Sequence, residues 1–510
     1  MTTFRYLSLV PFLIIAACGD NAAPPGGGSS SGGSSSSSSG NVPQDGGADV
    51  IPAASISLAI ADATVIQGST VELTLELTRG ASVTGDVGVK FATLPLGLGL
   101  PVGDLVFKAG QSTLKVQLSA GIDGKQGDAK LSATATTLDG ATSSKKDFTV
   151  LVRGAPGTLD KTFGVDGTLK LPTIGILSRL EVLADGSAFV AGPDYEDGSL
   201  RVVKVKPDGT VDTAYGMAGA AAGDITDNDV SDNIVVRPDG SVLVSGKLKG
   251  TGAARAFRFG PTGTFDLGFG AVDDARSADA RTSVVATSQY LYLASSAGND
   301  TYMTRYSFAG VRDTTYPLFV GYTNLGAMTL GSDGLVTMCG SDNANATFDV
   351  ARLNAAGTPD NTINLPVTPA GVYRRCFAIA ARKAGGVFLG LNSGLSARST
   401  QTAMIAATKS ALQLDTTFGS AGAFAVGEGR VTGITEDASQ RPVAVVTGST
   451  GSRVVRLTAA GAFDTSFGAG GSSAAATGDS YVNAKVLPNA RILVVGIRSD
   501  DSSRLYRLWN

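Results

Sequence analysis

The nine residues LDTTFGSAG at 414–422 recur along the chain and decide its fold. Close copies are LDKTFGVDG at 159–167 and FDTSFGAGG at 463–471. Aligned on its aspartate, this Asp phrase occurs at Asp160, Asp212, Asp266, Asp313, Asp360, Asp415 and Asp464. The spacings are 52, 54, 47, 47, 55 and 49 residues. A period of about 50 residues without a helical pattern indicates a solenoid or a propeller.

Each repeat has the same interior between two copies of the phrase. An apolar stretch leads to a tight turn, as in PDGSVLVSG at 238–246, and a third strand then ends near an Arg or Lys. Asp-Gly pairs favour hairpin turns, so each repeat is predicted to form four antiparallel strands, one blade of a β-propeller. Seven repeats predict seven blades. The chain stops where an eighth phrase would begin, so the segment near 158–170 is predicted to complete the last blade and close the ring.

The Asp phrase has a mechanical interpretation. Its Asp can accept hydrogen bonds from nearby backbone N–H groups, its Gly permits a positive φ, and its Phe or Tyr is predicted to fill the wedge between blades. Cations recur near the ends of the third strands, at Lys204, Arg258, Arg305, Arg352, Arg456 and Arg507. Structural ion pairing or snorkelling is the first interpretation of these cations, and a ring that binds an anionic polymer is the alternative.

The repeated sequence pattern LDxTFGxxG…DGxxxxxG…RLxxxG over residues 158–510 resembles that of the delta-60 repeat β-propellers of bacterial envelope proteins. The resemblance is strong in repeats one, two, six and seven and weak in repeats three to five. It implies a propeller fold and an extracytoplasmic location. It implies no reaction and supplies no catalytic motif.

The first residues of the chain are predicted to be an export signal, with Arg5 as the positive charge and 7–17 as a short apolar core. The residues IAAC at 15–18 resemble the lipobox of bacterial lipoproteins, which implies cleavage before Cys18 and lipid attachment to its sulfur. An ordinary secretory signal is the alternative. Gly19 follows the cysteine where an Asp would favour the inner membrane, so the resemblance favours the outer membrane.

Composition divides the chain into four parts. Residues 1–17 are the predicted signal peptide, and 18–53 are a Gly/Ser-rich disordered tether. Residues 54–153 alternate between apolar and polar side chains, as in VELTLELT at 71–78, which predicts a β-sandwich of six or seven strands. This pattern resembles bacterial Ig-like domains, which implies a spacer or an adhesive role. With the propeller at 158–510, the predicted fold class is all-β.

Composition also restricts the function. The chain has 510 residues, a formal net charge of −3 and no histidine. The charge excludes a basic nucleic-acid footprint. The missing imidazole removes Ser-His-Asp triads and histidine metal ligands. We recognise no catalytic residue and no cofactor motif.

Two candidate sites remain. The loop at 223–233 holds Asp224, Asp227 and Asp229 close together, a spacing of oxygen ligands that predicts a Ca²⁺ site. A solvated acidic loop is the alternative. Cys339 and Cys376 fall in adjacent repeats and are predicted either to pair as a disulfide in an oxidising compartment or to remain buried thiols.

The sequence therefore predicts a membrane-anchored lipoprotein of the cell envelope, periplasmic or surface-exposed, whose propeller loops bind a protein or polysaccharide without catalysis. The alternative is a carboxylate-based hydrolase or lyase acting on envelope or extracellular polysaccharide. Converging carboxylates in the central funnel would favour the enzyme. A funnel lined by small apolar and hydroxyl groups would favour binding.

Overall fold

The computed structural model describes residues 54–510 except 176–178, 195, 197, 227–232, 248–252, 270–272, 275–281, 298–299, 317–318, 322–324, 343–346, 366–372, 397–398, 475 and 477. Every regular element in the described residues is a β-strand, which confirms the predicted all-β class. No helix in the described part of the chain could span a membrane.

Residues 56–153 form two sheets around one hydrophobic core. The first sheet has the order β1 (Ile56–Ile60), β3 (Thr70–Arg79), β7 (Thr113–Ala120), β5 (Leu98–Gly99). The second has the order β2 (Ala63–Ile66), β9 (Ser143–Arg153), β8 (Gly127–Thr137), β4 (Val87–Phe91), β6 (Leu105–Phe107).

The alternation of β3 behaves as predicted, because Leu73, Leu75 and Leu77 are buried while the residues between them are exposed. The described part of this region has nine strands where six or seven are predicted. Two of the nine, β5 and β6, are two and three residues long, too short to show a period of two in the sequence.

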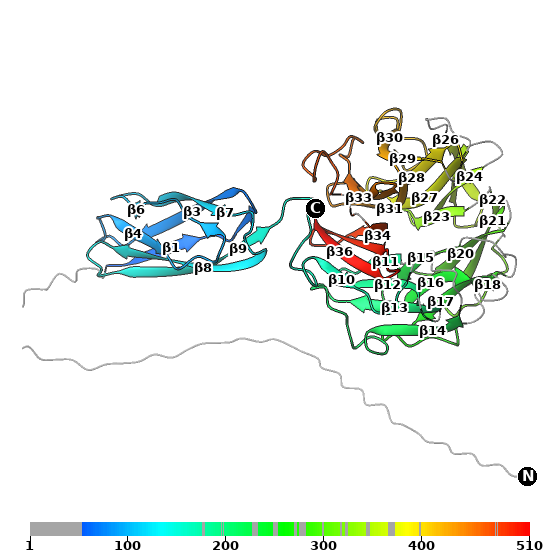
Figure 1. Cartoon of the computed structure of the whole chain (residues 1–510), viewed down its shortest axis with the longest axis horizontal. Helices are drawn as coiled ribbons and strands as arrows, with labels where there is room; N and C mark the ends of the chain where they lie inside the picture. The colour runs from blue at the N-terminus through cyan, green and yellow to red at the C-terminus, as the bar shows by residue number, and fades with distance from the viewer. Residues whose placement is uncertain are drawn as a thin grey trace, which may run out of the picture. The chain divides into compact units, whose positions relative to one another are not determined.

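Residues 168–509 form seven further sheets among the described residues, which lie radially in Figure 1. The first three are β11 (Arg179–Val182), β12 (Ala188–Pro193), β13 (Ser199–Val205), β14 (Ala220–Thr226); β15 (Asn233–Val236), β16 (Val242–Lys247), β17 (Ala254–Phe259), β18 (Asp273–Asp274); and β19 (Thr282–Ala286), β20 (Tyr290–Ala297), β21 (Asp300–Ser307), β22 (Phe319–Gly321).

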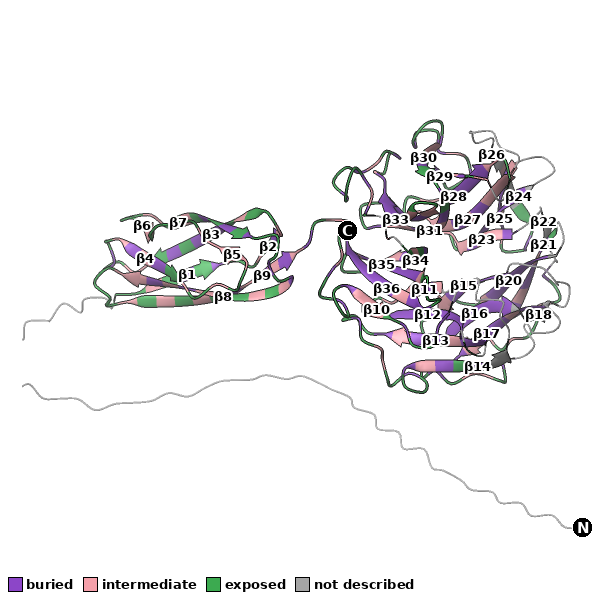
Figure 2. Ribbon diagram, viewed as in Figure 1, coloured by how far each residue is buried: buried purple, intermediate pink, exposed green. Residues whose placement is uncertain are grey.

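The next three are β23 (Leu325–Leu330), β24 (Val336–Asp342), β25 (Thr347–Leu353), β26 (Pro359–Leu365); β27 (Tyr373–Ala381), β28 (Val387–Gly394), β29 (Thr402–Ala407), β30 (Ala423–Glu428); and β31 (Arg430–Glu436), β32 (Pro442–Gly448), β33 (Gly451–Arg456). The last has the order β10 (Thr168–Lys170), β36 (Ser503–Trp509), β35 (Arg491–Arg498), β34 (Asp479–Val486). Second strands such as β12, β28 and β35 are almost wholly buried (Figure 2).

The first strands of the seven sheets contact one another in succession. The order of contact is β11, β15, β19, β23, β27, β31 and β34, and β34 also contacts β11. The bulges in β23, β27, β31 and β34 fall where these strands lie side by side. First strands from all seven sheets therefore surround one position, where the candidate site lies.

The last sheet takes strands from both ends of this region. β10 pairs with β36 in antiparallel register, with Thr168 opposite Tyr506. Before β10, the Gly157 N–H donates to the Trp509 carbonyl over 2.7 Å. The segment that precedes the first repeat is thus hydrogen-bonded to the final strand of the chain.

The sixth sheet departs from the predicted four strands. It has three, β31 to β33, among the described residues. The described part of the segment that follows pairs with β33 through isolated bridges, Val455 to Ser472 and Ser452 to Ala476. Its Gly, Ser and Ala residues at 468–476 lack the β-branched and aromatic side chains that favour strands.

Candidate functional site

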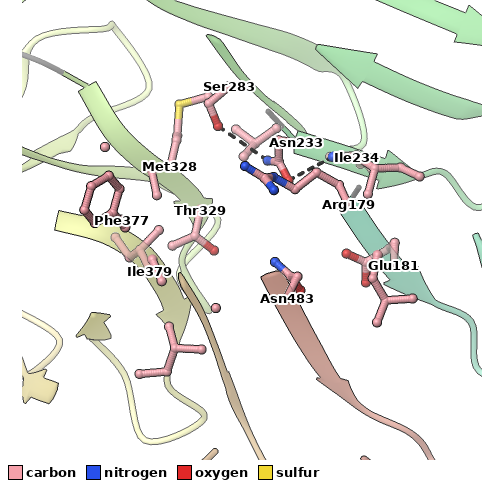
Figure 3. Close-up of a pocket in the computed structure, with 18 of the residues that line it drawn as sticks. Arg179, Glu181, Asn233, Ile234, Ser283, Met328, Thr329, Phe377, Ile379 and Asn483 are labelled. Carbon is pink, nitrogen blue, oxygen red and sulfur yellow. Dashed lines mark hydrogen bonds between the residues drawn. The ribbon is translucent and has the colours of Figure 1, made fainter. Parts of the chain in front are cut away.

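A cavity of about 240 Å³ lies among the first strands of the seven sheets (Figure 3). Residues of β11, β15, β19, β23, β27, β31 and β34 all line it. Each strand contributes only a few residues, so the walls combine side chains that lie far apart in the sequence.

One wall is charged. Arg179 and Glu181 come from β11, and Lys485 comes from the neighbouring β34. Arg179 and Glu181 are two residues apart, so they lie on the same side of their strand. The Lys485 ammonium lies 2.6 Å from the Glu181 carboxylate, in a pair that stays about 30% exposed on each side. Two cations and one carboxylate give the described lining a formal charge of +1.

Two carboxamides extend this polar wall. The Asn233 Nδ2 donates to the Val284 carbonyl over 2.8 Å, which holds the side chain against the neighbouring sheet. The Asn483 Oδ1 is buried and finds no hydrogen-bond donor among the described residues. Figure 3 shows the Asn483 side chain directed into the cavity. A bound molecule with a hydroxyl or N–H group could supply the missing donor.

The opposite wall is apolar. Met328 comes from β23, and Phe377 and Ile379 come from β27. Figure 3 places these side chains across the cavity from Arg179 and Glu181. Hydroxyl groups of Thr329 and Thr432 lie in the lining as well. The cavity therefore offers charge and hydrogen bonds on one side and apolar contact on the other.

The recurring cations do not line this cavity, and among the described residues five of the six form ion pairs with the Asp phrases. In the seventh phrase, the Arg456 Nε donates to the Asp464 Oδ2 over 2.9 Å, and the Arg456 side chain is 2% exposed. The guanidinium carbon lies 4.7 Å from the centre of the Phe467 ring. The Asp464 Oδ1 accepts hydrogen bonds from the Ser466 N–H and hydroxyl. We call this group of four residues the clasp.

Four other repeats contain the same ion pair. The pairs are Lys204–Asp212 at 3.2 Å, Arg258–Asp266 at 2.7 Å, Arg305–Asp313 at 3.0 Å and Arg507–Asp160 at 2.9 Å. The last pair joins the two ends of the region. The sequence allows either structural ion pairing or a ring of cations that binds an anionic polymer. The structure contains the ion pairs.

Four of the Asp phrases also contact the next repeat through the glycine that follows their Phe or Tyr. The N–H groups of Gly164, Gly216, Gly419 and Gly468 donate to the carbonyls of Asp208, Thr262, Ala460 and Pro156. Each acceptor lies four residues before the Asp of the next phrase. Pro156 stands four residues before Asp160, the first phrase, so the joint between the chain ends repeats the hydrogen bond of the interior joints.

Cys339 in β24 and Cys376 in β27 are joined by a disulfide. The S–S distance is 2.03 Å and the Cα atoms are 5.9 Å apart. Both cysteines are 1% exposed. The bond links the fourth repeat sheet to the fifth, the adjacent pair in which the sequence places them.

The other predicted site residues lie wholly or partly outside the described residues. Cys18, Asp227 and Asp229 belong to segments that the structure does not describe. Asp224 falls within β14, but its side chain is outside the described part. The lipid and Ca²⁺ sites stay predictions. In the described residues, no group of three or more His, Cys, Asp or Glu side chains could hold a metal ion.

The residues of the cavity are not singled out by the sequence analysis, although a signal exists. Arg179 and Glu181 stand four and two residues before Leu183, where the hairpin turn of their repeat begins. Asn483 and Lys485 stand at the same offsets before Leu487. At these two offsets the other repeats place only uncharged residues, namely Asn and Val, Ser and Val, Ala and Thr, Ala and Ala, and Gly and Thr, so a comparison of the repeats would single out the charged residues of β11 and β34.

Comparison with known proteins identifies the class of fold. Residues 444–467, which cover most of β32, all of β33 and the first five residues of the seventh Asp phrase, match a family described as a domain of unknown function (DUF5122) beta-propeller. With the radial arrangement of the repeat sheets, this match supports a β-propeller fold. No curated protein matches the chain.

Solved structures similar to the chain share little sequence with it. Sqt1 from Chaetomium thermophilum is 11% identical, with 64% of this chain and 81% of that chain covered and a TM-score of 0.34. A prolyl endopeptidase is 9% identical, with 81% and 55% covered and a TM-score of 0.36. CaCohA2 from Clostridium acetobutylicum is 10% identical, with 19% and 90% covered and a TM-score of 0.14. At these values the likenesses carry no functional argument.

Proposed function

We propose that the chain is a lipid-anchored protein of the bacterial envelope that acts as a non-catalytic binding or scaffold module. Cys18 carries the lipid, residues 18–53 form a tether, and 54–153 form an Ig-like spacer. Residues 158–510 form a closed propeller of seven blades that presents the ligand site. The outer membrane is the proposed location, with the folded part periplasmic or surface-exposed.

The contacts between sheets support the closed seven-bladed arrangement. Each first strand contacts the next, and β34 contacts β11. Gly468 donates to Pro156 as Gly164 donates to Asp208, so the joint at the chain ends has the same chemistry as an interior one. Closure of this kind leaves no open sheet edge at the first and last repeats.

The composition of the central cavity carries the choice of binding over catalysis. Glu181 is the one carboxylate in its described lining, and Lys485 pairs with it at 2.6 Å. Hydrolysis of glycosides by carboxylates uses two of them, about 5–10 Å apart. Apart from Arg179, the remaining lining is small, apolar, amide or hydroxyl, which is suited to recognition of a ligand.

A variant that fills the cavity tests the binding proposal. Thr329→Arg places a long side chain in the cavity, whereas Thr213→Arg makes the same change at an exposed position in the second Asp phrase. We expect the wild type and Thr213→Arg to retain the same ligands on a glycan array and in a pull-down from envelope extract. Thr329→Arg should lose them. Equal retention by both variants would contradict a ligand site in the cavity.

The anchoring proposal has its own test. Cys18→Ser should abolish incorporation of labelled palmitate and release the protein from the outer-membrane fraction, because a single sulfur carries the diacylglycerol. Lys90→Ser, at an exposed position in β4, is the control and should change neither result. A Cys18→Ser protein that stays in the outer-membrane fraction would contradict the lipid anchor.

A further inference from the structure

We infer that the two sheets at 56–153, here called the sandwich, fasten the joint at which the two ends of the repeat region meet. One buried side chain of the sandwich, Gln126, accepts hydrogen bonds from both ends at once. The sandwich is then more than a spacer, because its folding and the pairing of the two ends stabilise each other.

The joint between the two ends lacks the covalent turn that interior repeats have. In the first repeat sheet, Val205 at the end of β13 pairs with Val211, and the hairpin turn at 206–210 connects them. In the last sheet the equivalent pair is Leu508 of β36 with Leu159. These two residues lie at opposite ends of the region, so bringing them together costs more loop entropy than an interior turn does. Non-covalent contacts must hold this pair in place.

Gln126 supplies such contacts. It stands immediately before β8 and is 8% exposed. Its Oε1 accepts from the indole N–H of Trp509 over 3.1 Å and from the backbone N–H of Lys161 over 2.8 Å. Trp509 ends β36, and Lys161 belongs to the first Asp phrase. The Gln126 Nε2 donates to the Gln67 Oε1 over 2.9 Å, which fixes the orientation of the carboxamide.

The packing around Gln126 is close. A Cβ added at Gly154 would lie 2.8 Å from both the Gln126 Nε2 and the Trp509 Cδ1. Trp509 is 3% exposed, and the guanidinium carbon of Arg491 lies 4.3 Å from the centre of its ring. Arg491 also pairs with Asp160 of the first phrase at 3.2 Å. Removing the Gln126 carboxamide would therefore leave a buried indole N–H without its acceptor, at a cost to the whole joint.

Trp509 makes the joint observable, because it is the only tryptophan in the sequence. Gln126→Leu replaces the carboxamide by an apolar side chain. In the full chain this variant should increase acrylamide quenching of the Trp509 fluorescence and speed amide exchange in β36 about tenfold, because a buried N–H loses its acceptor. Gln117→Leu, the same change at an exposed position in β7, should alter neither result. Equal quenching and exchange in Gln126→Leu and the wild type would overturn the inference.

A substitution in the sandwich core tests the coupling itself. Leu75→Ala removes a side chain that is 0% exposed in that core. It should lower the urea midpoint of the Trp509 fluorescence in the wild-type background and leave it unchanged in the Gln126→Leu background. If Leu75→Ala unfolds the sandwich outright, Trp509 should become as open to acrylamide as in Gln126→Leu. A Trp509 midpoint and quenching that Leu75→Ala does not move would show that the two regions fold independently.

Discussion

Between the sixth and seventh repeat sheets the clasp places an aromatic ring at the joint, whereas between the fourth and fifth an aliphatic side chain stands at that position beside a disulfide. At the former joint, Phe467 of the seventh phrase is buried and packs against Gly157, which stands three residues before the next phrase. Gly157 has a φ of 83° and its Cβ position would lie 3.0 Å from Gly468. A large ring on one side thus requires glycine on the other.

We call the contact between the fourth and fifth sheets the fourth joint. There a smaller side chain replaces the aromatic ring, and a larger one replaces the glycine. Ile363 stands where the other phrases place Phe or Tyr, and Leu412 stands where the next turn places glycine elsewhere. Leu412 is 1% exposed and holds a φ of 54°. Ile363, Leu412 and both disulfide cysteines share one hydrophobic cluster.

The cation at this joint also contacts its own hairpin turn. Arg352 pairs with Asp333 of that turn at 3.2 Å, and the Asp333 side chain is 41% exposed. A pair so exposed contributes little to stability. The difference teaches that this fold can join two sheets by an aromatic ring beside a buried ion pair or by a disulfide within an aliphatic cluster. At the fourth joint the disulfide accompanies the replacement of the aromatic ring.

The largest expected effect follows from removing the disulfide. The bond closes a loop with a sequence separation of 37, for which loop entropy predicts about 4 kcal/mol of stabilisation. The double variant Cys339→Ala/Cys376→Ala should lose about that much in urea unfolding. Reductant should destabilise the wild type and leave the double variant unchanged. A loss below about 1 kcal/mol would show that the aliphatic cluster holds this joint by itself.

The next effect separates a buried ion pair from an exposed one. Arg456→Met removes the more deeply buried of the two arginines that pair with the Asp464 carboxylate, which should cost about 3 kcal/mol in the free energy of unfolding. Lys115→Met, which removes an exposed pair with Glu72 in β3, should cost about 1 kcal/mol or less. Equal losses, measured by the same urea titration, would mean that the clasp contributes no more than the exposed pair.

The exchanged sizes predict an unusual order of substitutions at Leu412. Leu412→Ala loses buried apolar contact and keeps the positive φ, so it should cost about 3 kcal/mol. Leu412→Gly loses the same contact but relieves about 1 kcal/mol of backbone strain, so it should cost about 2 kcal/mol. Chemical unfolding of both variants tests the order. A Leu412→Gly variant less stable than the Leu412→Ala variant would show that the backbone at Leu412 is not strained.

The clasp was predictable because every part of it repeats. The positions of Asp464 and Phe467 recur in most copies of the phrase, and their turn and wedge roles are local consequences of residue type. The buried faces of strands such as β3 were predictable for the same reason, since alternation is visible within one strand.

The cavity was not predictable from such local signals. Glu181 and Lys485 lie at opposite ends of the repeat region and form an ion pair because β34 contacts β11. Leu412 breaks the glycine position in a single repeat, which an alignment of the repeats would reveal without saying what it packs against. Both features depend on which sheets become neighbours, a property of the whole region.

The smallest expected effect is a difference in how much local stability the two kinds of joint lose in acid. Hydrogen bonds from the Thr315 hydroxyl and then Arg305 lower the pKa of Asp313 to about 2. Burial alone would raise the pKa of Asp464, but Ser466 and the two nearby arginines outweigh it and lower that pKa. In the unfolded chain these carboxyls titrate near pH 3.9. As the pH falls toward that value, the unfolded chain therefore binds more protons than the folded chain. The clasps therefore contribute fully above about pH 5 and progressively less as the pH falls through their native pKa values.

Since a disulfide does not titrate in this range, the covalent link should limit the loss of protection at the fourth joint at low pH. Hydrogen exchange at pH 3 and pH 7, corrected for intrinsic rates, should show a larger loss of local opening free energy in β31 and β34 than in β24 and β27. Asp464→Asn should remove most of this pH dependence around β31 and β34, because its side chain cannot ionise. An equal loss at both joints would mean that acid acts on the whole ring, and the two kinds of joint would then differ in chemistry but not in response.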